Sequence, residues 1–135
     1  MDLDKSLNIS AAGMRAQGTR LRVIAENIAN ASSTAQTPGG EPYRRKLVTF
    51  GNELDRSLGV ETVQVDSIVA DRSAFSRRYE PGHPAADEEG YVLTPNVNSL
   101  MEMADLREAQ RSYEANLKAI ESSRSMLQKT IDILR

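Results

Sequence analysis

The stretch LNISAAGMRAQGTRLRVIAENI, residues 7–28, decides the fold class. Its apolar and small side chains recur in steps of three and four, and its large ones recur every seven residues: Leu7, Met14, Leu21 and Ile28. This spacing puts them on one narrow face of an α-helix, which is typical of a helix that packs against another helix. The Asn, Ser and Thr residues that follow predict that the helix ends between residues 27 and 33.

A second helix with the same spacing is predicted at the other end of the sequence. Pro95 marks its start, and Asn96 or Asn98 is suited to cap its first turn. Its large side chains again recur every seven residues: Leu106, Tyr113, Ile120 and Leu127. A parallel line of the same helix carries polar residues, which weaken a simple coil but fix its register: Asn116, Ser123 and Thr130. The sequence therefore predicts two long helices that serve as interaction surfaces.

The segment between the helices has a different pattern. Turn residues surround four short stretches with strand character: residues 43–50, 60–70, 75–79 and 91–93. In the second stretch, Val63, Val65 and Val69 alternate with Gln64 and Asp66, so the valines are expected on one face. We therefore expect residues 1–30 and 96–135 to form a helical core domain, and residues 31–95 to form a loop and a small β-rich insertion.

The composition argues against an enzyme. The chain has 135 residues, no cysteine, one histidine and a formal net charge of −2. Disulfides, thiolate metal sites and a cysteine nucleophile are thereby excluded. His83, in a Pro-Gly-His-Pro turn, is interpreted as an exposed turn residue, and Asp87–Glu89 as a solvated acidic turn. We expect no catalytic residues, cofactor, metal or small-molecule substrate.

Two short basic clusters, at residues 44–46 and 77–78, raise the question of nucleic acid. They lack interleaved aromatic residues, and the chain has no basic excess, so no nucleic-acid partner is expected. No run approaches the roughly 18 apolar residues of a membrane span. The acidic start lacks the pattern of a cleaved signal peptide.

Three blocks resemble the bacterial flagellar basal-body rod family, and most closely its proximal-rod branch. They are residues 25–30 (AENIAN), residues 40–46 (GEPYRRK), which are particular to that branch, and residues 79–97 with their continuation through residue 116. The residues that carry the family motif, and to which the resemblance gives a role in assembly, are Asn27, Asn30, Pro42, Tyr43, Pro95, Asn96, Val97, Arg111, Tyr113 and Asn116. One departure is Arg107-Glu108, where family members usually have an apolar and a small residue.

The resemblance implies a mainly α fold in which the terminal helices pair as an antiparallel coiled coil. The intrachain seam would be formed by Leu7, Met14, Leu21 and Ile28 against Leu106, Tyr113, Ile120 and Leu127. Copies would stack helically into the rod, the drive shaft that transmits torque for motility, in the periplasmic part of the basal body. The implied partners are further copies, sibling rod proteins, the membrane (MS) ring, an adaptor beside the export gate, and the flagellar type III apparatus, which exports the subunit without a cleaved signal peptide.

Two other functions stay open on the sequence. The chain is also consistent with a sibling rod subunit at another axial position, against which residues 40–43 and the Pro81–Pro84 turn argue. A helical adaptor of the same export system is the alternative from another class. Such an adaptor would be ordered and compact as a free monomer, whereas an isolated rod subunit would expose an unpaired helix seam.

Overall fold

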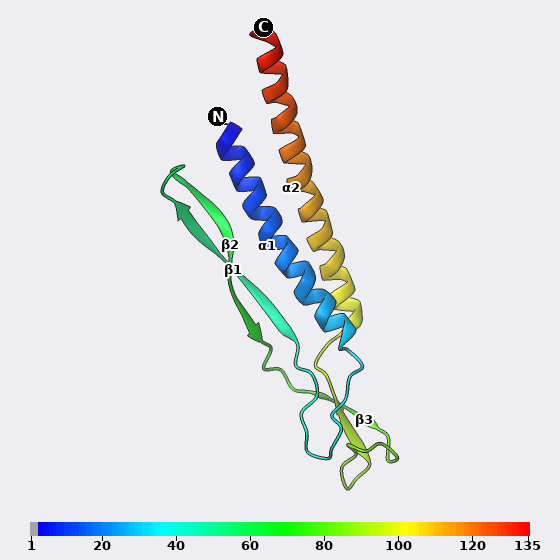
Figure 1. Ribbon diagram of the computed structural model, residues 1–135. Helices are drawn as coiled ribbons and strands as arrows, with labels where there is room; N and C mark the ends of the chain where they lie inside the picture. Colours follow the sequence, from blue (N-terminus) through cyan, green and yellow to red (C-terminus); the bar gives the residue numbers. More distant parts are fainter. Residues whose placement is uncertain (1–2) are drawn as a thin grey trace. The chain divides into compact units, whose positions relative to one another are not determined.

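The computed structural model describes residues 3–135, and it has a helix at each end with strands between them (Figure 1). The elements in chain order are α1 (Leu3–Ala29), β1 (Lys46–Asp55), β2 (Val60–Ala70), β3 (Ser76–Tyr79), β4 (Tyr91–Thr94) and α2 (Ser99–Ile133). The strands form two separate two-stranded sheets, β1–β2 and β3–β4. The prediction of two terminal helices around a small β-rich insertion is confirmed, although the first strand begins and ends later than residues 43–50.

Local hydrogen bonds explain where the helices begin and end. Asn98 caps α2, because its side-chain Oδ1 accepts bonds from the amides of Leu100 (3.1 Å) and Met101 (3.3 Å). Of the two candidate caps, Asn98 is therefore the one used. At the end of α1, the Asn30 side chain donates to the carbonyl of Glu26 at 2.8 Å, within the range expected for the end of this helix. Neither helix is long and apolar enough to cross a membrane.

The chain forms two compact units, and each helix contributes to both. The first unit contains Met1–Leu21, Val48–Ser67 and Arg107–Arg135, and the second contains Arg22–Leu47 and Ile68–Leu106. The division expected from the sequence, with residues 31–95 as a separate insertion, stays a prediction. We describe each unit by itself.

In the first unit, α1 lies between the β1–β2 hairpin and α2 (Figure 1). The hairpin strands are antiparallel, since Thr49 bonds to Ser67 (Oγ1 to Oγ, 2.7 Å) and Thr62 bonds to the carbonyl of Glu53 (3.3 Å). Apolar burial here is small. The hydrophobic residues that reach full burial in this unit are Ala12, Ala16 and Ala109. Because an alanine removes little apolar area from water, this unit gains little stability from its own core.

The second unit has larger buried side chains. Its buried hydrophobic residues are Val23, Ile24, Ala85 and Val92. The β3–β4 pair is antiparallel, with Ser76 opposite Thr94 and Tyr79 opposite Tyr91. Gly90, just before β4, has a φ of 85°, and a Cβ there would lie 2.9 Å from the Tyr79 ring. Glycine is required at this position both for its backbone conformation and for the close approach of the tyrosine.

Candidate assembly interface

The two helices of the first unit run side by side in opposite directions. Three contacts give their register: Ser6 Oγ to Ser123 Oγ (3.3 Å), Gly13 against the Asn116 side chain, and Arg20 Nη2 to Glu108 Oε2 (3.5 Å). The position on α2 falls as the position on α1 rises, so the pairing is antiparallel. A Cβ at Gly13 would lie 2.8 Å from Asn116 Oδ1, which shows how closely the helices approach here.

Small and polar residues form the centre of this helix contact. Ala109 has no exposed surface and Ser123 is buried, and both lie on the line of α2 that also holds Asn116. The side chains predicted for the seam flank this line and are half-buried: Leu7, Met14, Leu21, Ile28, Leu106, Tyr113 and Ile120. Leu127, the eighth member, is 42% exposed. The assignment of these eight residues to an intrachain seam stays a prediction.

The departure at Arg107-Glu108 lies on the exposed side of α2. Both residues are exposed, and Glu108 reaches the Arg20 guanidinium across the helix pair. The neighbouring Ala109 is the residue that points into the contact. The polar residues are therefore accommodated at the edge of the contact, where an exposed ion pair contributes little.

In the second unit, the family-motif residue Asn27 is a buried hydrogen-bonding centre. Its Nδ2 donates to the carbonyl of Lys46 (2.9 Å) and to Oε2 of Glu102 (3.1 Å), and its Oδ1 accepts from the Tyr43 hydroxyl (2.8 Å) and the Lys46 amide (3.0 Å). Only 1% of its surface is exposed. Asn27 thus ties α1 to α2 and to the segment that leads into β1.

Glu102 forms an ion pair with Arg45. It lies seven residues before Ala109, on the same line of α2 as Asn116 and Ser123. Its side chain is 1% exposed and accepts a bond from Arg45 Nε. Arg45 also lies 3.4 Å from Asp71 Oδ2 and 3.7 Å from Asp105 Oδ2. Burial acts to lower the pKa of Arg45, but bonds and charges from Glu102 and Asp71 outweigh it and raise the pKa. A buried carboxylate is tolerated here because it is paired and hydrogen-bonded.

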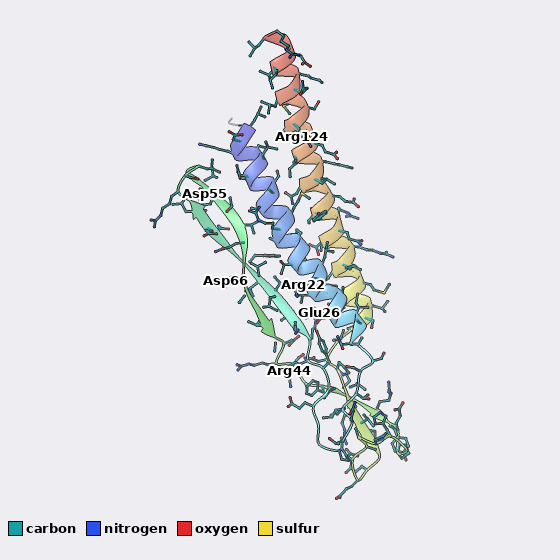
Figure 2. The ribbon with its side chains drawn as sticks, viewed as in Figure 1. Arg22, Glu26, Arg44, Asp55, Asp66 and Arg124 are labelled. Carbon is teal, nitrogen blue, oxygen red and sulfur yellow. The ribbon has the colours of Figure 1, made fainter. Side chains whose placement is uncertain are left out.

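An ion-pair network lies next to Asn27 at the end of α1. Glu26 pairs with Lys46 at 3.1 Å and with Arg22 at 3.3 Å, one helical turn earlier (Figure 2). The hydrogen bond from Lys46 is the main reason that the pKa of Glu26 is lowered. These groups are largely solvated, so the network orients the Lys46 segment more than it stabilises the fold.

The remaining motif residues divide between structural and exposed positions. Asn96 accepts a bond from the Arg45 amide (2.8 Å) and donates to the carbonyl of Asp71 (3.1 Å). Pro42 and Pro95 are buried, Val97 and Tyr113 are half-buried, and Asn116 donates to the Ser112 carbonyl (2.9 Å). Within residues 3–135, Arg111 is the motif residue whose exposed side chain makes no hydrogen bond or ion pair. Most of the motif residues are therefore buried or bonded within the subunit, and their role in assembly stays a prediction.

The turn around His83 corrects one expectation. His83 is half-buried, not exposed, and both of its ring nitrogens have partners: Nδ1 accepts from the Ala85 amide and Nε2 contacts Thr34 Oγ1, each at 3.0 Å. This arrangement fits a neutral imidazole that donates through Nε2. His83 joins the 31–42 loop to the turn before β4, which is a structural role.

The charged clusters are used within the chain. Arg44 lies 4.2 Å from the centre of the Phe75 ring, and Arg77 pairs with Asp87 (2.9 Å) and Glu89 (3.4 Å). Asp87 is also bonded by the Tyr91 amide, which is the largest cause of its lowered pKa; Arg77 adds to it, and burial opposes it. The acidic residues therefore form an ordered turn on the surface.

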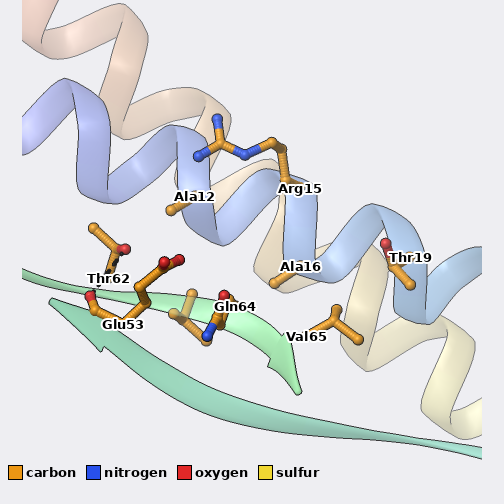
Figure 3. A pocket seen from close by; sticks show the side chains of 9 residues that line it. Ala12, Arg15, Ala16, Thr19, Glu53, Thr62, Gln64 and Val65 are labelled. Carbon is orange, nitrogen blue, oxygen red and sulfur yellow. Dashed lines mark hydrogen bonds between the residues drawn. The ribbon is translucent and has the colours of Figure 1, made fainter. Parts of the chain in front are cut away.

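A groove of about 280 Å³ runs between α1 and the hairpin in the first unit (Figure 3). Ala12 and Ala16 form its helical wall, and Glu53, Thr62 and Gln64 are on the strand side. Its polar groups include one arginine and one carboxylate, without a histidine or cysteine. Over residues 3–135, no three His, Cys, Asp or Glu residues are placed to hold a metal ion.

Large apolar residues remain exposed along α2. Apart from Leu117, they gather near its two ends: Leu100, Met101 and Met103 at the start, and Met126, Leu127, Ile131 and Ile133 at the finish, with Leu134 directly after the helix. Exposure near the two ends ranges from 42% for Leu127 to 84% for Ile133. Apolar surface of this kind marks sites of protein interaction. In the isolated subunit, α2 therefore has apolar side chains that no other part of the described chain covers.

Sequence reasoning missed the buried pair Glu102–Arg45. Arg45 belongs to the short basic cluster at residues 44–46, and the sequence pattern gives Glu102 no separate role. A signal was present, because Glu102 precedes Ala109 by seven residues and so continues the line of Asn116 and Ser123. The partner across 57 positions has no comparable signal in the sequence.

Comparison with known proteins identifies the family. A model described as flagellar basal body rod FlgEFG protein C-terminal matches residues 88–133. The flagellar basal-body rod protein FlgC of Agrobacterium fabrum is 54% identical over 133 residues, which cover 98% of this chain and 96% of that protein. The proteins of the same name from Bacillus subtilis (40% identical, 95% of each chain) and Salmonella typhimurium (39%, 98% of each chain) are also similar. The chain therefore belongs to the FlgC family of flagellar basal-body rod proteins.

Proposed function

We propose that this chain is a structural subunit of the flagellar basal-body rod, in its proximal part, and that it polymerises helically through its terminal helices. The observation that carries this proposal is the exposure of large apolar residues near both ends of α2, in a chain that matches FlgC proteins over almost its whole length. A monomer gains nothing from such exposure, whereas a subunit in an assembly buries these side chains against neighbours.

The terminal helices pair as an antiparallel coiled coil in the assembled subunit. The contacts at Gly13 and at Arg20 support this pairing, since their register is antiparallel and they are seven residues apart on α1 and eight apart on α2. The half-buried heptad side chains on either side of the central line would close on each other and on neighbouring helices. Interlocked side chains of this kind resist sliding, which a shaft that transmits torque requires.

The partners follow from this role. They are other copies of the chain and sibling rod proteins, together with the membrane (MS) ring and the adaptor near the export gate at the base of the rod. The subunit reaches the periplasmic space through the flagellar type III apparatus. The alanine core of the first unit supports passage in an unfolded form, since little apolar burial must be undone.

Substitutions on the helix pair test the proposal. Leu21→Asp and Ile120→Asp each put a charge at a half-buried heptad position, so we expect loss of swimming while the protein is still made. Leu21→Met is the matched control, since it keeps an apolar side chain of similar volume and should leave swimming intact. The assay uses a strain that lacks its own copy, with immunoblots of cells and of isolated basal bodies. Normal swimming by both aspartate variants would refute the role of the helix pair.

Neither the sibling subunit nor the export adaptor is favoured by the comparisons, whose curated relatives carry the FlgC name. Limited proteolysis of the purified monomer, followed by circular dichroism of the fragments, separates a rod subunit from an adaptor. A rod subunit should lose its helical ends early, whereas uniform resistance along both helices would point to an adaptor.

A further inference from the structure

The β3–β4 pair of the second unit presents an exposed aromatic face. Tyr79 stands opposite Tyr91, and Arg77 stands opposite Leu93, so these four side chains share one side of the two-stranded sheet. Tyr79 is 62% exposed, and Tyr91 and Leu93 are each 38% exposed. Val92, which points to the opposite side, is 1% exposed. The sheet thus buries one face in its own unit and offers the other to solvent.

The side chains of this exposed face contact one another. The rings of Tyr79 and Tyr91 meet edge to face, with their centres 5.3 Å apart, and the Arg77 guanidinium lies 4.6 Å from the centre of the Tyr91 ring. Asp87 and Glu89 hold Arg77 in this position. Tyrosine and arginine are enriched among the residues that contribute most to protein interfaces, and here they already contact one another before a partner binds.

A cavity of about 250 Å³ adjoins the aromatic face. Tyr91, Leu93 and Ala85 line it on one side, and Gly39 and Gly40 of the long loop lie on the other. Its volume is below the range of roughly 300–1,000 Å³ typical of small-molecule sites, which favours a side chain of a protein partner as its occupant. The surrounding segment, residues 77–91, has two arginines and four carboxylates, so a partner with a basic excess fits it best.

The end of α2 has the complementary properties. Ser6 lies opposite Ser123, so Leu3 is opposite about residue 126 in the antiparallel register, and the residues after it extend past the described part of α1. Leu127, Ile131 and Leu134 are exposed there. Residues 124–135 contain three basic side chains and one acidic one. This segment therefore joins protruding apolar side chains to a positive net charge.

We propose that the end of α2 in one copy, residues 127–134, docks on the β3–β4 aromatic face of the next copy. This inference rests on the proposed rod function. A helical polymer requires a heterologous contact, in which two different surfaces of the same chain meet and the contact repeats from copy to copy. The aromatic face and the α2 end are two such surfaces, with opposite net charge and with a cavity on one and exposed apolar side chains on the other. Seating Ile131 or Leu134 at this cavity would bury both apolar surfaces.

Cysteine cross-linking in assembled rods tests the contact. The chain has no cysteine, so a Leu93→Cys, Ile131→Cys double variant reports only on the engineered pair. We expect mild oxidation of isolated basal bodies to give a ladder of disulfide-linked multimers. The matched control replaces Ile131→Cys with Glu114→Cys, which is exposed in the middle of α2, and should give no ladder.

The outcomes separate this inference from the rod function. Absence of the variants and of the unmodified chain from basal bodies would overturn the rod function. Normal incorporation without a 93–131 cross-link would overturn only the docking contact. Dimers formed by a variant with only one of the two cysteines, or a cross-linked product with the mass of another rod protein, would overturn the docking contact in the same way. Tyr79→Ala should lower the cross-link yield about tenfold or more, whereas Phe50→Ala, an exposed aromatic on the other hairpin, should not.

A charge exchange gives an independent readout. Glu88 and Lys129 are exposed, and neither has an ion pair within residues 3–135. Glu88→Lys or Lys129→Glu alone should lower the yield of the 93–131 cross-link, and the two together should restore it. Equal yields from the single and double variants would show that these charges do not meet in the assembly.

Discussion

Replacement of Asn27 by alanine removes the hydrogen-bonding centre of the second unit. The side chain makes four hydrogen bonds, but its partners differ in burial. Glu102 is buried, so its lost bond cannot be replaced by water. Lys46 is exposed and Tyr43 is half-buried, so water can partly replace theirs. The variant therefore loses one charge-assisted bond fully and three neutral bonds in part.

This reasoning gives a magnitude. A hydrogen bond to a charged group contributes about 1.5–3 kcal/mol, and a partly solvated neutral bond contributes about 0.5 kcal/mol. With the lower value for the charged bond, the expected loss in the free energy of unfolding is about 3 kcal/mol. Since a domain of 60–100 residues loses roughly 4–8 °C for each kcal/mol, the unfolding midpoint of the second unit should fall by about 12–24 °C.

Asn30→Ala is the matched control, because Asn30 is the same residue type three positions later on the chain. Its side chain donates one bond, to the carbonyl of Glu26, so its loss should cost about 1 kcal/mol or less. The thermal unfolding midpoint of both variants is measured by circular dichroism. Amide exchange at Lys46 gives a local reading, since that amide donates to Asn27, and it should accelerate about 100-fold. An Asn27→Ala effect no larger than that of Asn30→Ala would refute the central role of Asn27.

Three further predictions concern other positions. Gly13→Ala should lower the thermal midpoint through a loss of about 1–3 kcal/mol, because Asn116 must move, whereas Gly18→Ala, with open space around it, should stabilise α1 by up to about 1 kcal/mol. Asp87 has a lowered pKa, so its contribution to stability is present above its ordinary pKa of about 3.9 and is lost as the pH falls through the pKa of the folded state. Asp87→Asn should therefore make the free energy of unfolding depend less on pH between about pH 2 and 6. Gly90→Ala should weaken the β3–β4 pair by about 1–2 kcal/mol because of its positive φ, measured as a shift in urea midpoint. An unchanged midpoint in any of these variants would contradict the contact concerned.

The sequence by itself determined the element types. Seven-residue spacing in residues 7–28 and 106–127 is a local property of a helix, and so both helices were predicted within a few residues of their ends. Alternation fixed β2 at Val60–Ala70 in the same way. Asn98 was recognisable as a cap because a cap acts on the next two or three residues. The family, too, was readable from contiguous motifs.

Only the tertiary structure decided which side chains are buried. The large heptad residues are predicted to form the intrachain seam, which stays a prediction, whereas burial and close approach in the helix contact are found at Gly13, Ala109 and Ser123. The spacing of a stripe does not say which of two adjacent lines faces a partner, since the close approach of two backbones depends on both helices together. The partners of Asn27 and Glu102 come from positions 16 to 75 residues away. No periodicity encodes such pairings, because they depend on where the fold brings distant segments together.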